Sequence, residues 1–295
     1  YDAQAADWGG RRSTSVWRVI WRRMTQPGLE RSVHLALLPP GPTAVGTTYQ
    51  LALKSRSNED LAFLAGLAVS IPLDYMVKIS GRTDLHLDLV GRWPIPSGVH
   101  LRTQLLLRVL RLNCLTADYA SLWEELFDAR WRQDGWTDQG LTRVAIGGID
   151  SVWTMDTPLR RDRDRWQALV EIDALVARML GLSADQLCAM YRTQFGVLRK
   201  YEHKMVFDAE GRKICGHHHG AGSRQRQIQN LAKAGELSKE WTNLWKLYEQ
   251  FEADPTSVDW LGHYTPPFIH ADREFAMRRA WLTFADTEAH AEIEG

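Results

Sequence analysis

The sequence predicts an α+β fold, in which a small module of mixed strands and helix is followed by a mainly helical C-terminal part. Short segments near the N-terminus alternate apolar and polar residues with the period of two that half-buried strands show. From residue 101 onward, apolar residues recur at helical spacing instead. The 295 residues are 44% hydrophobic and 24% charged, which is enough for a buried core and for more than one domain.

Three strands are expected at the start of the module. Residues 17–24 alternate in the way a strand requires. Residues 33–38 are apolar and are stopped by the prolines and glycine of residues 39–42. Residues 47–53 are expected to form the third strand.

A helix is expected after these strands, from about Glu59 to Ile79. Asn58 is the expected N-cap, and Pro72 is expected to kink the helix because proline lacks the amide hydrogen that the helical ladder needs. A short strand is expected over residues 85–90.

The downstream part is expected to be helical, most clearly from Arg165 to Leu180. Gly181 is expected to end that helix in the left-handed conformation, and Ser183 with Gln186 forms a capping box for the next one. Residues 131–160 are rich in turn-forming residues and are expected to be irregular. A tight turn at residues 208–211 and helices over 238–252 and 272–284 complete the expected elements. The expected domains are a recognition module in residues 1–112, a mainly helical region in 113–215 and a C-terminal helical region in 216–295.

The net charge of zero is unevenly distributed. Residues 1–112 hold 14 Lys and Arg against 8 Asp and Glu, and the remaining residues hold 22 against 28. A basic part joined to an acidic part indicates that the first faces a polyanion, with a chance distribution as the alternative.

Cysteine usage and hydropathy indicate a soluble, cytoplasmic protein. The three cysteines are far apart in the sequence and odd in number, which fits a reducing compartment better than a disulfide framework. The longest apolar stretch, Leu61 to Ile71, is short for a membrane span, and no membrane partner is expected. Because the chain begins at Tyr1 without a targeting signal, we interpret it as part of a longer protein.

Signatures of catalysis and of metal binding are weak. The sequence has no glycine-rich dinucleotide or phosphate loop, no nucleophile elbow and no Asn-Pro-Pro-Tyr motif, so no catalytic residue is expected. Thiolate and imidazole groups from Cys215 and His217-His218-His219 suit zinc, but a tetrahedral site usually takes a second ligand pair that the sequence does not offer. We expect a polar loop there and no metal.

Two sets of polar and basic residues are candidates for contact with nucleic acid. The first is interleaved with tryptophans, as in proteins that bind a phosphate backbone, although an exposed strand face with cation–π pairs has the same composition. The second lies in an Arg/Gln/Asn-rich run, whose residue types read base edges or hold phosphates but also open solvated helices. The first set is Arg11, Arg12, Arg18, Arg22, Arg23 and Arg31, and the second is Arg224 and Arg226.

Several short motifs follow one another in a fixed order. They are Trp17-Arg18 with Arg22-Arg23, Leu37-Leu38-Pro39-Pro40-Gly41, Leu61-Ala62-Phe63-Leu64-Ala65-Gly66-Leu67 running to Ser70, Asp74-Tyr75 with Lys78, Leu85-His86-Leu87 and Trp93-Pro94-Ile95-Pro96. In order and spacing, this series resembles the target-recognition region of large adenine-specific DNA methyltransferases. Those proteins belong to type IIG restriction–modification enzymes and to phage-defence systems such as DISARM and BREX. Residues 112–123 and 165–201 look like the downstream portion of the same proteins.

The resemblance implies a module that docks on double-stranded DNA. An upstream Rossmann-like methyltransferase domain of the same parent chain would bind S-adenosylmethionine and flip the adenine, so no cofactor is expected in this fragment. The enzyme activity would belong to that parent. Arginines of the first set are expected on phosphates, and the turn after the expected helix is expected to reach a base edge. The residues at that turn are Lys78, Arg82, Thr83 and His86.

Two other functions stay open at this point. One is a protein–protein docking module for other subunits of a defence complex, anchored by exposed aromatic residues. The other is an independent enzyme that uses the histidine cluster. The aromatic candidates are Trp241, Trp245, Tyr248 and Trp260.

Overall fold

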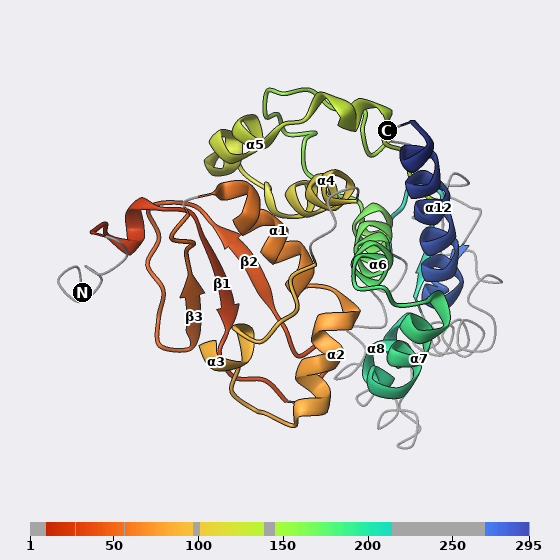
Figure 1. Ribbon diagram of the computed structural model, residues 1–295, viewed down its shortest axis with the longest axis horizontal. Helices are drawn as coiled ribbons and strands as arrows, with labels where there is room; N and C mark the ends of the chain where they lie inside the picture. Colours follow the sequence, from red (N-terminus) through yellow and green to blue (C-terminus); the bar gives the residue numbers. More distant parts are fainter. Residues whose placement is uncertain are drawn as a thin grey trace, which may run out of the picture.

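The three N-terminal strands form an antiparallel sheet in the order β2-β1-β3, with helices on one face (Figure 1). Together with the helices that follow, this sheet confirms the α+β expectation. The computed structural model describes residues 10–26, 28–55, 57–96, 101–138, 145–203, 205–213 and 269–294. Its helices and strands are β1 (Arg18–Arg22), β2 (Leu35–Leu38), β3 (Thr48–Leu51), α1 (Asn58–Ala68), α2 (Ile71–Ser80), α3 (Leu87–Val90), α4 (Arg102–Asn113), α5 (Ala120–Leu126), α6 (Asp162–Met179), α7 (Ala184–Gln194), α8 (Gly196–Glu202), β4 (Val206–Phe207), β5 (Ile269–His270) and α12 (Arg273–Glu294), with short 3-10 helices at Ser13–Ser15, Ala117–Tyr119 and Ala129–Gln133.

Alternation along β1 decides which face of the sheet is buried. Val19 is in register with Leu37 of β2 and Leu51 of β3, so these three apolar side chains share one face. Trp21 lies on the same face, and α1 packs against it. The expected strand period is therefore confirmed.

The expected single helix over residues 59–79 is wrong, because the chain forms two helices bent by 62°. Ser57, not Asn58, caps α1 by accepting the amide of Asp60 at 2.9 Å. Ser70 caps α2 in the same way. Pro72 lies in the first turn of α2, where backbone amides have no acceptor within the helix, so the amide hydrogen that proline lacks is not needed. Among the described residues, no single helix has the length and apolar character of a membrane span, and the bent pair α1–α2 meets that test only when both helices are taken together.

The expected strand over residues 85–90 is also wrong. Only the residues around Asp84 are extended, and they pair in antiparallel fashion with Met24. The chain then turns into the one-turn helix α3, with His86 at its N-cap position. Extended pairing is thus confined to the point where the chain crosses the end of β1.

Helix α6 is the centre of the helical part, with α4, α7 and α12 packed around it (Figure 1). It confirms the expected helix and begins three residues earlier than expected, at Asp162. The left-handed Gly181 (φ 71°) and the capping box of Ser183 are confirmed as well. The turn at residues 208–211 is confirmed by Gly211 (φ 77°), and α12 is longer than the expected helix. One apolar core extends across residue 112 and joins both parts, with members that include Leu37, Leu107, Trp123, Trp131, Ile172 and Phe284.

Arg18 is buried beneath the loop that follows β2. Its guanidinium donates to the carbonyl oxygens of Pro39 (3.2 Å) and Pro42 (2.8 Å) and to the side-chain oxygen of Gln50 (2.8 Å). Replacing Arg18 by alanine leaves these acceptors unpaired, so we expect the free energy of unfolding to fall by about 2–4 kcal/mol. Urea unfolding measures this. Arg22→Ala, on the same strand face but exposed, is the control and is expected to change stability by less than about 0.5 kcal/mol; equal losses would contradict the role of Arg18.

Candidate nucleic-acid interface

The end of β1 and the turn after α2 are joined by backbone hydrogen bonds (Figure 1). The amide of Thr25 donates to the carbonyl of Thr83 at 2.8 Å, and the amide of Leu85 donates to the carbonyl of Arg23 at 2.8 Å. These bonds unite residues that are about 60 positions apart in the chain. We call the exposed side chains of these two segments the cationic surface, which consists of Arg22, Arg23, Arg82, Thr83, His86 and Arg92. Arg22 shares the strand face of Arg18, opposite that of Trp21 and Tyr49.

Arg23 is held in place and yet remains accessible. Its Nε donates to Asp84 Oδ2 at 2.9 Å, and its guanidinium carbon lies 5.4 Å from the centre of the Tyr49 ring. The hydrogen bond to Asp84 raises the pKa of Arg23, which keeps the guanidinium charged. With 44% of the side chain exposed, Arg23 can exchange this partner for a phosphate oxygen.

Asp88 orients the part of the cationic surface that follows α2. Arg82 Nη1 donates to Asp88 Oδ2 at 2.7 Å, and this bond lowers the pKa of Asp88. The ring of His86 stands edge-on to Tyr49 with ring centres 5.4 Å apart, which links this half to Arg23. Arg22 and Arg92 make no side-chain hydrogen bond or ion pair with another described residue.

Four residues of this region escaped the sequence analysis. Tyr49 gave a usable signal, since it falls on the same face of its expected strand as the apolar residues and so belongs beside Trp21. Asp84, Asp88 and Arg92 are isolated charges in a turn, and no spacing rule singles them out. The four arginines of this region outnumber its two aspartates, so the region keeps a cationic excess for an anionic partner.

Three residues expected on DNA must be withdrawn, because their side chains serve the interior of the fold. Arg18 has no exposed surface and binds carbonyl groups of its own chain. The ammonium group of Lys78 donates to the carbonyl of Leu29 at 2.7 Å, and burial lowers its pKa. Arg31 is 14% exposed and lies between two buried carboxylates.

Arg11 and Arg12 are exposed but lie apart from the cationic surface. They precede β1, whereas Arg22 and Arg23 stand at its far end. A five-residue strand spans roughly 17 Å, so the two pairs of arginines form separate patches. One continuous DNA contact through all of the expected arginines would have to extend along the whole strand.

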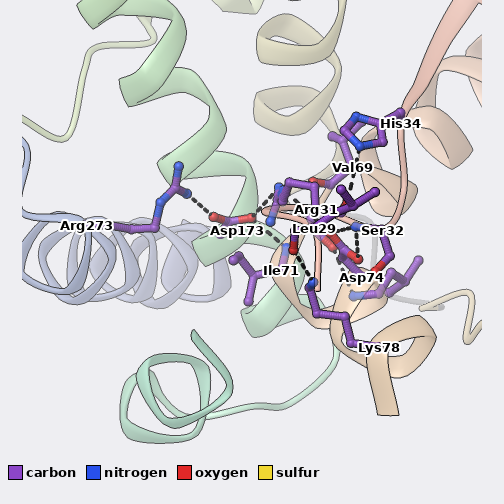
Figure 2. A network of polar contacts seen from close by, with 12 residues as sticks. Leu29, Arg31, Ser32, His34, Val69, Ile71, Asp74, Lys78, Asp173 and Arg273 are labelled. Atoms are coloured by element: carbon purple, nitrogen blue, oxygen red, sulfur yellow. Dashed lines mark hydrogen bonds and ion pairs between the residues drawn. The ribbon is translucent and has the colours of Figure 1, made fainter. Parts of the chain in front are cut away.

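A network of buried charges joins α2, α6 and the connection between β1 and β2 (Figure 2). Asp74 of α2 accepts the amide of Ser32 with both carboxylate oxygens, at 3.0 and 3.1 Å, and faces Arg31. Burial raises the pKa of Asp74, and Arg31 acts against this shift. The carboxylate and the amide together fix the connection between β1 and β2 on α2.

The remaining candidates lie outside the described residues. These are the DNA candidates Arg224 and Arg226, the metal candidates Cys215 and His217–His219, and the aromatic candidates Trp241, Trp245, Tyr248 and Trp260. Within the described ranges, no three His, Cys, Asp or Glu side chains come together as metal ligands would.

Comparisons with known proteins add no assignment. A scan against family models, a search of curated proteins and a search of solved structures each returned no match.

Proposed function

We propose that this protein binds double-stranded DNA through the cationic surface. The observation that carries the proposal is the convergence of two segments about 60 residues apart, the end of β1 and the turn after α2, on one exposed site. Each segment brings side chains that suit nucleic acid. Arg22 and Arg23 supply charge for phosphates, and Arg82, Thr83 and His86 supply hydrogen-bonding groups of the kinds that reach phosphates or base edges.

The two aspartates in the surface are compatible with this role. Asp84 and Asp88 orient Arg23 and Arg82, so that less side-chain freedom is lost when a phosphate binds. An aspartate can also accept a hydrogen bond from the amino group of cytosine. A surface that combines oriented arginines with hydrogen-bond acceptors is suited to selecting a DNA sequence. It is less suited to binding any polyanion.

Within this proposal, the protein is the target-recognition part of an adenine-specific DNA methyltransferase from a bacterial restriction–modification or phage-defence system. The order of sequence motifs supports the family, and the junction of the segment that carries Arg22-Arg23 with the segment that carries Arg82-Thr83 supports the DNA-reading role. S-adenosylmethionine and the base-flipping chemistry would belong to the catalytic domain of the parent chain. That domain is then the partner with which the module works.

Binding of the protein to duplex DNA at several salt concentrations tests the proposal, with fluorescence anisotropy as the readout. Arg22→Ala and Arg23→Ala are each expected to weaken binding about 3- to 10-fold across sequences and to reduce the slope of log K against log salt by about 0.9 per lost phosphate contact.

Arg192→Ala is the matched control for Arg23→Ala. Both arginines pair with a carboxylate, and their side chains are 46% and 44% exposed, but Arg192 lies on α7, away from the sheet. An unchanged salt slope in Arg22→Ala and Arg23→Ala would refute the assignment. Gel filtration with and without duplex separates DNA binding from the alternative of a protein–protein docking module.

A further inference from the structure

Asp173 of α6 contacts both segments that lead to the cationic surface, although it lies outside the surface itself (Figure 2). Its carboxylate is fully buried. Oδ1 accepts the amide of Ile71 at 2.7 Å and lies 3.9 Å from a guanidinium nitrogen of Arg31. One carboxylate of the helical part thus touches the start of α2 and the connection between β1 and β2.

Helix α2 transmits the position of its first residue to the cationic surface. Ile71 begins the helix, and ten residues later the left-handed Gly81 (φ 66°) ends it. Arg82 and Thr83 follow immediately. A helix of this length is a stiff rod of about 15 Å, so a shift at Ile71 moves the turn that carries Arg82.

The second contact of Asp173 acts on the β1 side. Arg31 also faces Asp74, its guanidinium donates to the carbonyl of Val69, and its charge lies 5.7 Å from the centre of the Phe195 ring. Arg31 therefore ties the segment that follows Arg23 to the end of α1 and to α2. Both edges of the cationic surface depend on the same buried carboxylate.

Asp173 is in turn fixed by α12. Arg273 Nη1 donates to Asp173 Oδ2, and Arg273 Nε lies 2.9 Å from both carboxylate oxygens of Glu202 on α8. Burial alone would lower the pKa of Arg273, but Glu202 and Asp173 more than offset it and raise the pKa, so the guanidinium stays charged. The carboxylate is thereby held by Arg273 of α12, which Glu202 of α8 fixes in turn, while it also holds α2.

We infer that Asp173 is a positioning residue, through which the helical part sets the geometry of the DNA-reading surface. The DNA consequence rests on the proposed function, whereas the positioning of α2 and of residues 24–34 does not. Binding of a partner that moves α12 would change the orientation of Arg82 and Arg23 without touching them.

Asp173→Asn tests the inference in the complete chain. The amide oxygen of asparagine still accepts the Ile71 amide, but the charge that holds Arg31 and Arg273 is lost. Hydrogen exchange followed by mass spectrometry is expected to accelerate at least tenfold in peptides covering residues 71–86 and 24–34, and less in the peptide of α4. DNA affinity is expected to fall at least fivefold with an unchanged salt slope, because the phosphate-binding arginines remain.

The control is Asp185→Asn, which removes an ion pair with Arg278 from a side chain that is 80% exposed. If Asp173→Asn does not fold, Arg31→Lys is used in its place. Lysine keeps the positive charge but cannot contact Asp173, Asp74 and the Val69 carbonyl together, so hydrogen exchange is expected to accelerate in the same peptides. Equal acceleration in all peptides, α4 included, would mean that Asp173 only stabilises the fold and would overturn the inference. If the wild-type protein fails to bind DNA, the proposed function fails, and the exchange pattern still decides the positioning role.

Discussion

Replacing Glu171 by alanine is expected to lower the free energy of unfolding by about 3–5 kcal/mol, because it removes one of the two carboxylates, Glu171 and Asp134, that pair with a buried arginine. Arg108 of α4 is completely buried and donates to Glu171 Oε2 at 2.6 Å. The other oxygen, Oε1, accepts the amide (2.8 Å) and the hydroxyl (2.7 Å) of Thr137 and the side-chain amide of Gln167 (2.9 Å). The substitution leaves all of these donors short of an acceptor.

Urea unfolding followed by tryptophan fluorescence measures this loss, since Trp123 and Trp131 are buried close to α4. Glu59→Ala is the control because Glu59 also pairs with an arginine, but its side chain is 51% exposed. An exposed pair contributes about 1 kcal/mol or less. Similar losses in the two variants would show that burial does not strengthen the dependence of Arg108 on Glu171.

Gly147→Ala is expected to be the most damaging change of a single small residue, with a loss of at least about 3 kcal/mol. A Cβ atom at this position would lie 1.8 Å from the carbonyl oxygen of Trp131 and 2.7 Å from that of Asp134. Both carbonyl oxygens belong to the backbone, so no change of side-chain rotamer can relieve the clash. The amide of Gly147 also donates to Asp134 O at 3.1 Å, so moving the segment away would break a hydrogen bond.

The neighbouring Gly148 provides a matched control. A Cβ atom there would meet its nearest atom, the Cβ of Ala145, at 3.5 Å, which is an ordinary contact. We expect Gly148→Ala to change the midpoint of thermal unfolding by no more than a few degrees, whereas Gly147→Ala lowers it by ten degrees or more or prevents folding. If both variants melt together, the close approach to Trp131 is not what constrains residue 147.

Local signals in the sequence predicted local structure well. The alternation along β1, the capping box at Ser183 and the left-handed Gly181 each depend on residues within a few positions of one another. The helix break at Ser70 does not follow from periodicity, because Pro72 alone also predicts a kink inside one helix. Ser70 two residues before it is a capping residue, and the pair marks the start of a second helix.

The candidate site could be predicted only in part, since strand periodicity says which face a residue shares but not what covers that face. Arg18 and Arg22 fall on the same side of β1, yet the loop of Pro39 to Pro42 covers the first and leaves the second exposed. The buried network of charges could not be predicted from the sequence at all. Asp173 and Ile71 are 102 positions apart, and no spacing in a single sequence brings them together.

The pairing of Met24 with Asp84 has a consequence for the order in which the protein folds. We expect the hairpin of β1 and β2 to form early because it closes a short loop, whereas the bridge to Asp84 closes a loop of about 60 residues and is expected to form only when α1 and α2 have packed. The arginines of the strand and those of the turn are therefore far apart in space until these helices have packed. We therefore expect the cationic surface to form late, and a local opening of this bridge would separate its two segments while the helical core stays folded.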